Sequence, residues 1–480
     1  MSTRMKQLMF IGIGLLAMFA IIYGMPPIEG LSKQARAALG VCAFAIIVWM
    51  SQAIDEAQSG FCIVILLVLT GAAGMGRALS GYANTGLWIV TLGMMMGTLM
   101  NSCGLSTRMA FYIVSKAGKK AKNLYWAVSI LTLVMSFFVP SLGAKTLLVV
   151  PLVAQMGLAF GAQKGHSSMV KGLLFVVASA GSMYCMGILT ANAANPISVG
   201  LIQAVTNYKV SWAEWFQMGF APALLLGLGG TYIAYKMFPP DVEDISSGQE
   251  SIQASLKAMG PMSFKEKYAL VVFCTTLVLW ATDKLTGLDS TLAAMMAVAA
   301  MILPGPQQIM DWRQTEQKVA WKVFVVYGAG LSMGSILVST GAAKWLAATF
   351  FSPMLHLDLR LQAVIFIWLI TCMQVFFTGT GPKTTALTPV IVTHAVAVAA
   401  LPANAGMQVT MFAALIASNM IHQYLLPVTN LPNMILSGTD EVTGNEIIKT
   451  GAVMTVYSAV FCTIMVYTYW TWVGVFALKP

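Results

Sequence analysis

The sequence contains very few charged residues. Asp, Glu, Lys and Arg together make up 9% of the 480 residues, whereas 58% are apolar. A soluble globular domain carries about 25% charged residues, so this chain has too little polar material to cover a soluble protein of its length. The composition therefore predicts a polytopic membrane protein. The apolar runs approach the ~20 residues of a spanning helix and lack the short alternating segments of a β-barrel, which predicts an all-α fold.

Motifs of enzymes and metal sites are also missing. The seven cysteines lie singly in apolar stretches without CxxC spacing, which argues against a disulfide framework or a metal site. No Walker loop, HExxH or GxSxG motif is present. We therefore expect no enzyme activity, no catalytic residues, no metal and no cofactor. The net charge of +10 comes from Lys and Arg in short loops, a pattern that orients membrane proteins, so we expect lipid as a partner and not nucleic acid.

The apolar runs predict eleven spanning helices. The first, Leu8 to Met25, lies in an N-terminal segment, 1–33, that lacks a convincing cleavage site, so we expect a retained helix. One long hydrophilic segment, 239–267, divides residues 34–238 from 268–480. The other predicted spans are 35–54, 59–77, 86–103, 172–206, 213–238, 268–286, 290–304, 322–343, 409–437 and 446–476.

Two further apolar stretches, 124–160 and 361–400, are each about twice the length of one span and are broken in the middle by Pro, Gly and Lys. Both flanks of 124–160 are basic, which places both on the cytoplasmic side. A segment that begins and ends on one side does not cross the membrane, so we expect a re-entrant helical hairpin with a polar tip. The flanks of 361–400 are nearly free of Lys and Arg, which predicts a second hairpin that faces outside.

The chain contains an internal repeat. Residues 143–146 (Gly-Ala-Lys-Thr) match 381–384 (Gly-Pro-Lys-Thr) at an offset of 238, and 192–195 (Asn-Ala-Ala-Asn) match 430–433 (Asn-Leu-Pro-Asn) at the same offset. Because the two hairpins have opposite flanking charge, we predict an inverted repeat with the N-terminus inside, the linker cytoplasmic and the C-terminus outside. Inverted repeats are typical of secondary transporters, whose site lies near the midplane where the halves meet.

Lys145 and Lys383 are the strongest single signals. A charge inside an apolar stretch costs several kcal/mol unless it is paired or hydrated. The alternative interpretation of each lysine is that its side chain snorkels to the membrane surface or contacts helix carbonyls. The matched positions of the two lysines in the two hairpins favour binding of an anion instead. Hydroxyls and helix N-termini at both tips suit the same ligand, and the two Asn-x-x-Asn segments predict unwound points in discontinuous helices, or otherwise simple proline kinks. The candidate substrate-binding residues are Ser141, Gly143, Lys145, Thr146, Asn192, Asn195, Thr380, Gly381, Lys383, Thr384, Thr429, Asn430 and Asn433.

With these motifs in view, the chain resembles the divalent anion/sodium symporter family, which includes dicarboxylate, citrate and sulfate carriers and plastid oxoglutarate/malate translocators. The resemblance is clearest in 140–145, 189–196 and 426–435. It implies eleven spanning helices, two opposed hairpins and a homodimer in which transport domains move against a fixed scaffold. Family members carry Ser-Asn-Thr at each tip, which binds substrate carboxylates and sodium. Here the matching residues are Ser-Leu-Gly at 141–143 and Gly-Thr-Gly at 379–381, so Ser141 alone is retained.

The loss of these side-chain oxygens predicts the mode of transport. A lysine ammonium supplies the positive charge that bound sodium would bring, which places the chain in an exchanger-like branch. We expect a sodium-independent antiporter of small di- or tricarboxylates in a bacterial inner membrane, working by alternating access. The alternatives are a sodium- or proton-coupled symporter of dicarboxylates, sulfate or organosulfonates. A membrane-embedded enzyme or a receptor is disfavoured, because paired carboxylates and an output domain are lacking.

Overall fold

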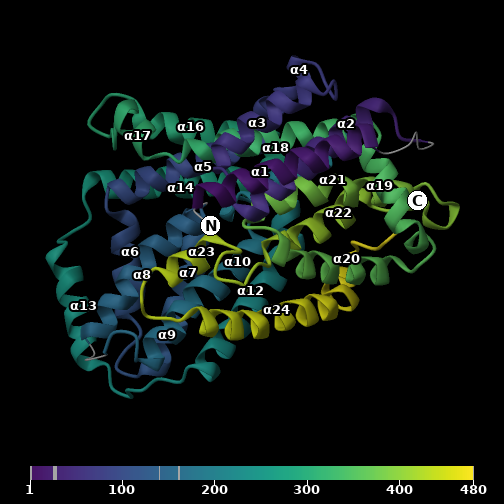
Figure 1. The fold of residues 1–480 in the computed structure, drawn as a ribbon. Coiled ribbons are helices and arrows are strands. Elements are labelled where there is room, and N and C mark those ends of the chain that lie inside the picture. The colour runs from purple at the N-terminus through teal and green to yellow at the C-terminus, as the bar shows by residue number, and fades with distance from the viewer. Residues whose placement is uncertain (1–2, 25–29, 140, 160–162, 479–480) are drawn as a thin grey trace.

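The computed structural model describes residues 3–24, 30–139, 141–159 and 163–478, and helices dominate these ranges (Figure 1). Within them, extended pairing is limited to two isolated bridges. In the described ranges, nine helices are long and apolar enough to span a membrane, and the number is ten if α5 (Thr85–Ser102) and α6 (Leu105–Ser115), which are bent by 71°, count as one span. This confirms the predicted all-α membrane protein.

The nine candidate spans are built from α1 (Thr3–Phe19) with the π-turn Ala20–Gly24, α2 (Lys33–Ser51), α7 (Ala121–Phe138), α8 (Leu142–Ala159), α9 (Ser168–Phe175) continuing through α10 (Gly181–Tyr184) to Gly187, α12 (Trp212–Met237), α18 (Trp321–Ser339), α20 (Leu359–Met373) continuing to Phe376, and α24 (Gly444–Tyr467) with α25 (Tyr469–Trp472). Three predicted spans are instead short apolar helices: α3 (Glu56–Leu69), α16 (Ser290–Ile302) and α22 (Val409–Ser418) with its 3₁₀ turn Asn419–Ile421. The predicted span at 268–286 is α14 (Phe264–Ala281), whose first turn carries three charged residues. The remaining helices are α4 (Met75–Ala78), α11 (Ala194–Thr206), α13 (Ser246–Ala258), α15 (Asp283–Thr286), α17 (Trp312–Lys318), α19 (Ala342–Phe351), α21 (Thr380–Ala399) and α23 (Leu431–Ser437).

Capping boxes fix where several helices begin. In three of them, a Ser or Thr hydroxyl accepts from the backbone amide three residues later, and a Glu side chain accepts from the cap residue's own amide. These three boxes start α12, α14 and α24, at Ser211, Ser263 and Thr443. These pairs satisfy amides that a helix end leaves free, so the three helices begin where the loops end.

The segment predicted as the first hairpin consists of α7 and α8. The chain leaves the helix at Val139, Pro140 lies outside the described residues, and α8 begins two residues later. Both ends of the segment contact the hydrophilic linker: the Ala121 amide donates to the Glu243 carbonyl (3.0 Å), and the Ser247 hydroxyl donates to the Ala159 carbonyl (3.4 Å). The segment therefore enters and leaves on one face of the molecule, as a re-entrant hairpin requires.

The second broken stretch consists of α20 and α21. His394, near the end of α21, is 2.8 Å from Gln362, near the start of α20, so the two helices run antiparallel. Both ends lie against the C-terminal segment, because Arg360 donates to the Thr471 hydroxyl (3.1 Å) and Met407 forms a bridge with Leu478. Like the first, this segment returns to the face on which it began.

Two helices are discontinuous at the Asn-x-x-Asn segments. The span that begins with α9 breaks up into 3₁₀ turns over 185–191, and α11 resumes at Ala194. In the second half, α22 ends in its 3₁₀ turn, residues 422–430 are not helical, and α23 follows. The first break is buried throughout, and the second is buried at its two ends, residues 422–424 and 429–430, so free backbone groups there need partners inside the protein.

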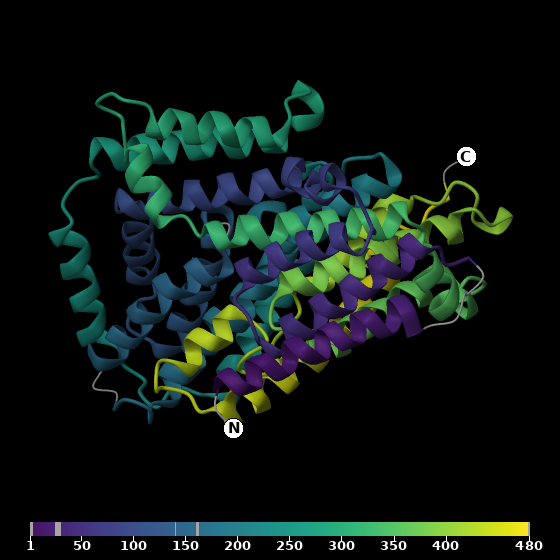
Figure 2. The same cartoon turned by 45° about the horizontal axis from the view of Figure 1, so that its top comes forward.

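The helices pack around two large apolar cores. One core joins α2, α3 and α18 with the start of α19, and α1 lies along α2 in Figures 1 and 2. The other core contains most of the remaining helices, including both hairpins and the discontinuous helices. Helix α13 of the linker stands at the edge of the molecule in both views. A cavity lies between the two cores, and the predicted motifs converge there.

Candidate functional site

A cavity of about 480 Å³ lies between the two apolar cores. One side is formed by the first tip (residues 141–143), the second tip (residues 378–380) and the two Asn-x-x-Asn segments. The opposite side, here called the α18 wall, is formed by the C-terminal end of α2, the start of α3 and the start of α18. The volume of the cavity falls in the range of about 300–1,000 Å³ that is usual for small-molecule sites.

On the side of the tips, four helices begin at this cavity. They are α8, α11, α21 and the short α23, whose first residues or caps line the space at Leu142, Ala193, Thr380 and Leu431. A helix N-terminus carries partial positive charge and presents free amides. Four of them pointing at one space make it suited to an anion.

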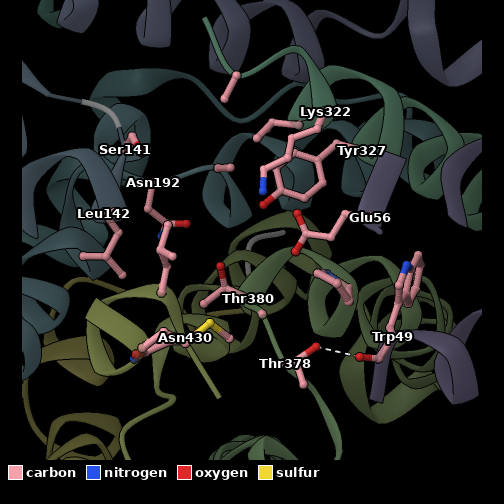
Figure 3. Close-up of a pocket in the computed structure, with 18 of the residues that line it drawn as sticks. Trp49, Glu56, Ser141, Leu142, Asn192, Lys322, Tyr327, Thr378, Thr380 and Asn430 are labelled. Carbon is pink, nitrogen blue, oxygen red and sulfur yellow. Dashed lines mark hydrogen bonds between the residues drawn. The ribbon is translucent and has the colours of Figure 1, made fainter. Parts of the chain in front are cut away.

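The first tip holds its shape through local contacts. The Ser141 hydroxyl accepts from the Ala144 amide (3.3 Å) and caps α8. Gly143 is buried against the side chain of Leu431, where a Cβ atom would overlap it. The Asn192 side chain faces the same space in Figure 3, and its Oδ1 accepts from the Ala194 amide (2.7 Å). The structure therefore joins the first tip to elements of both halves.

The second tip contacts the α18 wall. The Thr378 hydroxyl donates to the Trp49 carbonyl of α2 (2.6 Å), the contact drawn as a dashed line in Figure 3. Thr380 and Asn430 border the cavity beside it. Gly381 is buried against the Tyr327 ring, which a Cβ atom would overlap. The sequence therefore needs glycine where α21 passes α18.

Lys145 and Lys383 lie behind the tips and do not line the cavity. The Lys145 ammonium donates to the Ser136 hydroxyl (3.1 Å), the Cys185 sulfur (2.7 Å) and the Ala191 carbonyl (3.3 Å). The Lys383 ammonium, fully buried, donates to the His422 carbonyl (3.0 Å). Each lysine thus holds the broken helix of its own half. This geometry matches the alternative of a contact with helix carbonyls, although both charges stand directly behind the site.

The second asparagine of each segment also holds a break. Asn195 donates from Nδ2 to the carbonyls of Cys185 (2.8 Å) and Ile188 (3.0 Å). Asn433 donates in the same way to Tyr424 (2.9 Å) and Leu426 (3.0 Å). The bonds from Asn195 to Ile188 and from Asn433 to Leu426 are related by the offset of 238 found in the sequence. The two halves therefore use matched hydrogen bonds at matched positions.

The structure divides the candidate residues into two groups. Those that line the cavity are Ser141, Gly143, Asn192, Thr380 and Asn430. Those that lie behind it and shape the surrounding backbone are Lys145, Thr146, Asn195, Gly381, Lys383, Thr384, Thr429 and Asn433. The three threonines of the second group donate to carbonyls within their own turn, at Leu142, Thr380 and Leu426.

Sequence reasoning missed the charged residues of the α18 wall. Asp55 and Glu56 look like interfacial residues, because Asp55 caps α3 through a capping box with Gln58. Lys322 is the second residue of α18 and looks like an ordinary membrane-flanking lysine. All three line the cavity. No sequence signal marks them, because the wall is assembled from helices that lie far apart in the chain.

The cavity offers no clustered metal ligands. Across the described ranges, no three His, Cys, Asp or Glu side chains come together as a ligand set. The five ion pairs found there lie in loops or near helix ends, and none includes Lys145 or Lys383. The site therefore presents helix N-termini, hydroxyls and amides on one side and Asp55, Glu56 and Lys322 on the other. Lys145 and Lys383 lie behind the tips, and no ion pair of the described residues includes them.

Comparisons with known proteins agree with this architecture. The family model described as "Sodium:sulfate symporter transmembrane region" matches residues 6–476. A protein of Cupriavidus necator, named "Membrane protein", is 28% identical over 478 residues, which cover 95% of this chain and 91% of that protein. The "Sodium-dependent dicarboxylate transporter SdcS" of Staphylococcus saprophyticus is 24% identical over 92% of this chain and 87% of its own length. The "Putative malate transporter YflS" of Bacillus subtilis is 24% identical over 68% of each chain.

The fold is also similar to a solved structure. The YdaH transporter of Alcanivorax borkumensis superposes with a TM-score of 0.58 and 13% sequence identity, covering 100% of both chains. At this identity the similarity concerns the fold alone. It is consistent with the long helices and short apolar helices described above.

Proposed function

This chain belongs to the sodium:sulfate symporter family, and from that premise we propose that it is a secondary transporter that exchanges small divalent organic anions without sodium. It is an integral membrane protein. The family and the dicarboxylate and malate transporters related to it support a carrier of dicarboxylates or sulfate. Within that class, di- or tricarboxylates are our proposed substrates, and alternating access is our proposed mechanism. We place the protein in a bacterial inner membrane, as a homodimer surrounded by lipid, with the N-terminus inside and the C-terminus outside.

The observation that carries the proposal is the pair of buried lysines without a carboxylate partner. Lys145 and Lys383 are 4% and 0% exposed, and their described hydrogen-bond partners are all uncharged. A buried charge in a medium of low dielectric constant costs several kcal/mol unless an opposite charge compensates it. A dianion at the four helix N-termini supplies the missing negative charge. The loaded site is then close to neutral, and the empty site is not.

This charge balance explains exchange. Moving an empty site with two fixed positive charges across the membrane interior is costly, whereas moving the loaded site is not. The carrier should therefore reorient only when an anion is bound. That is the kinetic property of an obligatory exchanger. A sodium-coupled carrier would instead bring its positive charge from solution with each substrate.

The symporter remains a second candidate because of the α18 wall. Asp55 and Glu56 border the cavity, and their carboxylates suit a cation that enters with the substrate. Proton coupling uses the same groups. Charge accounting favours exchange, because Asp55 and Glu56 border the cavity from the wall, whereas the two lysines lie directly behind the tips.

Proteoliposomes test the proposal. Vesicles preloaded with unlabelled dicarboxylate should take up labelled dicarboxylate rapidly without sodium, while empty vesicles should take up almost none. Sulfate and an organosulfonate serve as alternative anions in parallel arms. Fast uptake into empty vesicles that scales with an imposed sodium gradient would replace exchange by symport, and a proton gradient in place of sodium identifies proton coupling. If no dianion is transported in any arm, the proposed function is wrong.

A further inference from the structure

The α18 wall carries a cationic side chain, Lys322, that has no role in the proposed transport cycle. Lys322 is the one positively charged residue among the described residues that line the cavity. Its side chain is exposed to the cavity, and in the described structure it makes no hydrogen bond and no ion pair within 4 Å. An ammonium that faces a binding cavity without a direct partner is available to a ligand.

The position of Lys322 is set by packing far from the tips. Helix α18 packs against α3 in the smaller apolar core, where Val326, Ala329 and Met333 are buried. Figure 3 shows the Lys322 ammonium, the Tyr327 hydroxyl and the Glu56 carboxylate directed into the same space, across from Asn192 and Ser141. The ammonium therefore faces the helix N-termini from the opposite side of the cavity.

Glu56 keeps this ammonium partly compensated. The two groups interact electrostatically but are not within ion-pair distance. Lys322 can therefore turn toward a stronger partner, because it loses little interaction energy when it moves away from Glu56. A carboxylate of the substrate, held in a cavity between two apolar cores, is such a partner.

We propose that Lys322 binds the second anionic group of a dianionic substrate, while the N-termini at the tips bind the first. This inference rests on the proposed function, and it names the feature that distinguishes substrates: two negative groups at opposite ends of a small molecule. A monoanion binds at the tips alone, and Lys322 then stays beside Glu56. The cavity then selects dicarboxylates over monocarboxylates of the same size.

The test is a competition assay in proteoliposomes that compares a dianion with a monoanion built on the same carbon chain. Unlabelled succinate and its monomethyl ester compete against labelled succinate during counterflow, with sodium held constant. Lys322→Gln should weaken inhibition by succinate about tenfold or more, the effect of losing one charge-assisted hydrogen bond, and should change inhibition by the ester less than about threefold. Lys322→Arg should keep the wild-type ratio of inhibition by succinate to inhibition by the ester. Lys344→Gln, at an exposed lysine of α19 that does not line the cavity, is the matched control.

The outcomes separate this inference from the proposed function. If the wild-type protein shows no counterflow of succinate or any other dianion, the proposed function fails first. If the wild-type protein transports succinate, two results contradict the role of Lys322. In one, Lys322→Gln keeps the wild-type ratio of inhibition by the two competitors; in the other, it weakens inhibition by succinate and by the ester to the same extent. Should Lys322→Gln not accumulate in the membrane, Glu56→Gln decides the question. It frees Lys322 and should strengthen inhibition by succinate about threefold, and an unchanged value overturns the proposal.

Discussion

Replacing Lys383 with Met tests whether the buried lysines serve transport or structure. The substitution keeps a long unbranched side chain and removes one buried charge and one hydrogen bond, from the ammonium to the His422 carbonyl at 3.0 Å. The side chain is fully buried, and no ion pair of the described residues includes it. The two losses act on stability in opposite directions, so their sizes decide the outcome.

Leaving one buried carbonyl without a partner costs about 1–3 kcal/mol. Removing an uncompensated buried charge saves several kcal/mol. We therefore expect Lys383→Met to be as stable as the wild-type protein or more stable, while exchange falls at least about tenfold because the loaded site is no longer neutral. Lys145→Met should be less stable than Lys383→Met, since the Lys145 ammonium bonds to three acceptors: Ser136, Cys185 and Ala191.

Thermal unfolding of the purified protein, followed with a thiol-reactive dye, measures the stability. All seven cysteines are free, and Cys42 and Cys462 are buried, so they react only after unfolding, whereas Cys274 and Cys372 are exposed and give the starting signal. Counterflow in proteoliposomes measures exchange on the same samples, with Lys344→Met as the control for loss of an exposed lysine. If Lys383→Met unfolds at a much lower temperature and still exchanges anions at the wild-type rate, the lysine is structural and the charge argument is refuted.

Two further predictions concern the hairpins. In a background without cysteines, single cysteines at Gly118 and Gly165 should be labelled only from the cytoplasm and one at Asn404 only from outside; labelling of 118 and 165 from opposite sides would mean that 124–160 crosses the membrane. Gly381→Ala places a Cβ atom against the Tyr327 ring, an overlap that costs about 1–3 kcal/mol, so it should slow exchange. Adding Tyr327→Ala should restore the rate lost through Gly381→Ala, and a double variant as slow as the single one contradicts this account.

The sequence alone determined the class of protein and the location of its motifs. Scarcity of charge and the length of apolar runs are properties of composition, and the repeat emerges from comparing the chain with itself, so neither requires contacts between distant residues. The same is true of the helix breaks: Asn-x-x-Asn segments with proline predict them, and the structure shows them at 185–191 and 422–430. The apolar runs at 59–77, 290–304 and 409–437 predict longer helices than the structure shows, because apolar residues in the adjoining turns extend each run beyond the end of its helix.

The tertiary structure alone decided which of these residues face the cavity. Lys145 lies in the first turn of α8, one turn beyond the capping residue Ser141, yet its ammonium bonds to Cys185 and Ala191, forty or more residues away in the sequence. The direction of a long flexible side chain depends on which acceptors lie within reach, and those belong to another helix. Glu56 and Lys322 approach each other only because α3 packs against α18. Local sequence carries no record of such a pairing, because each residue alone has the appearance of an ordinary charge at the end of an apolar helix.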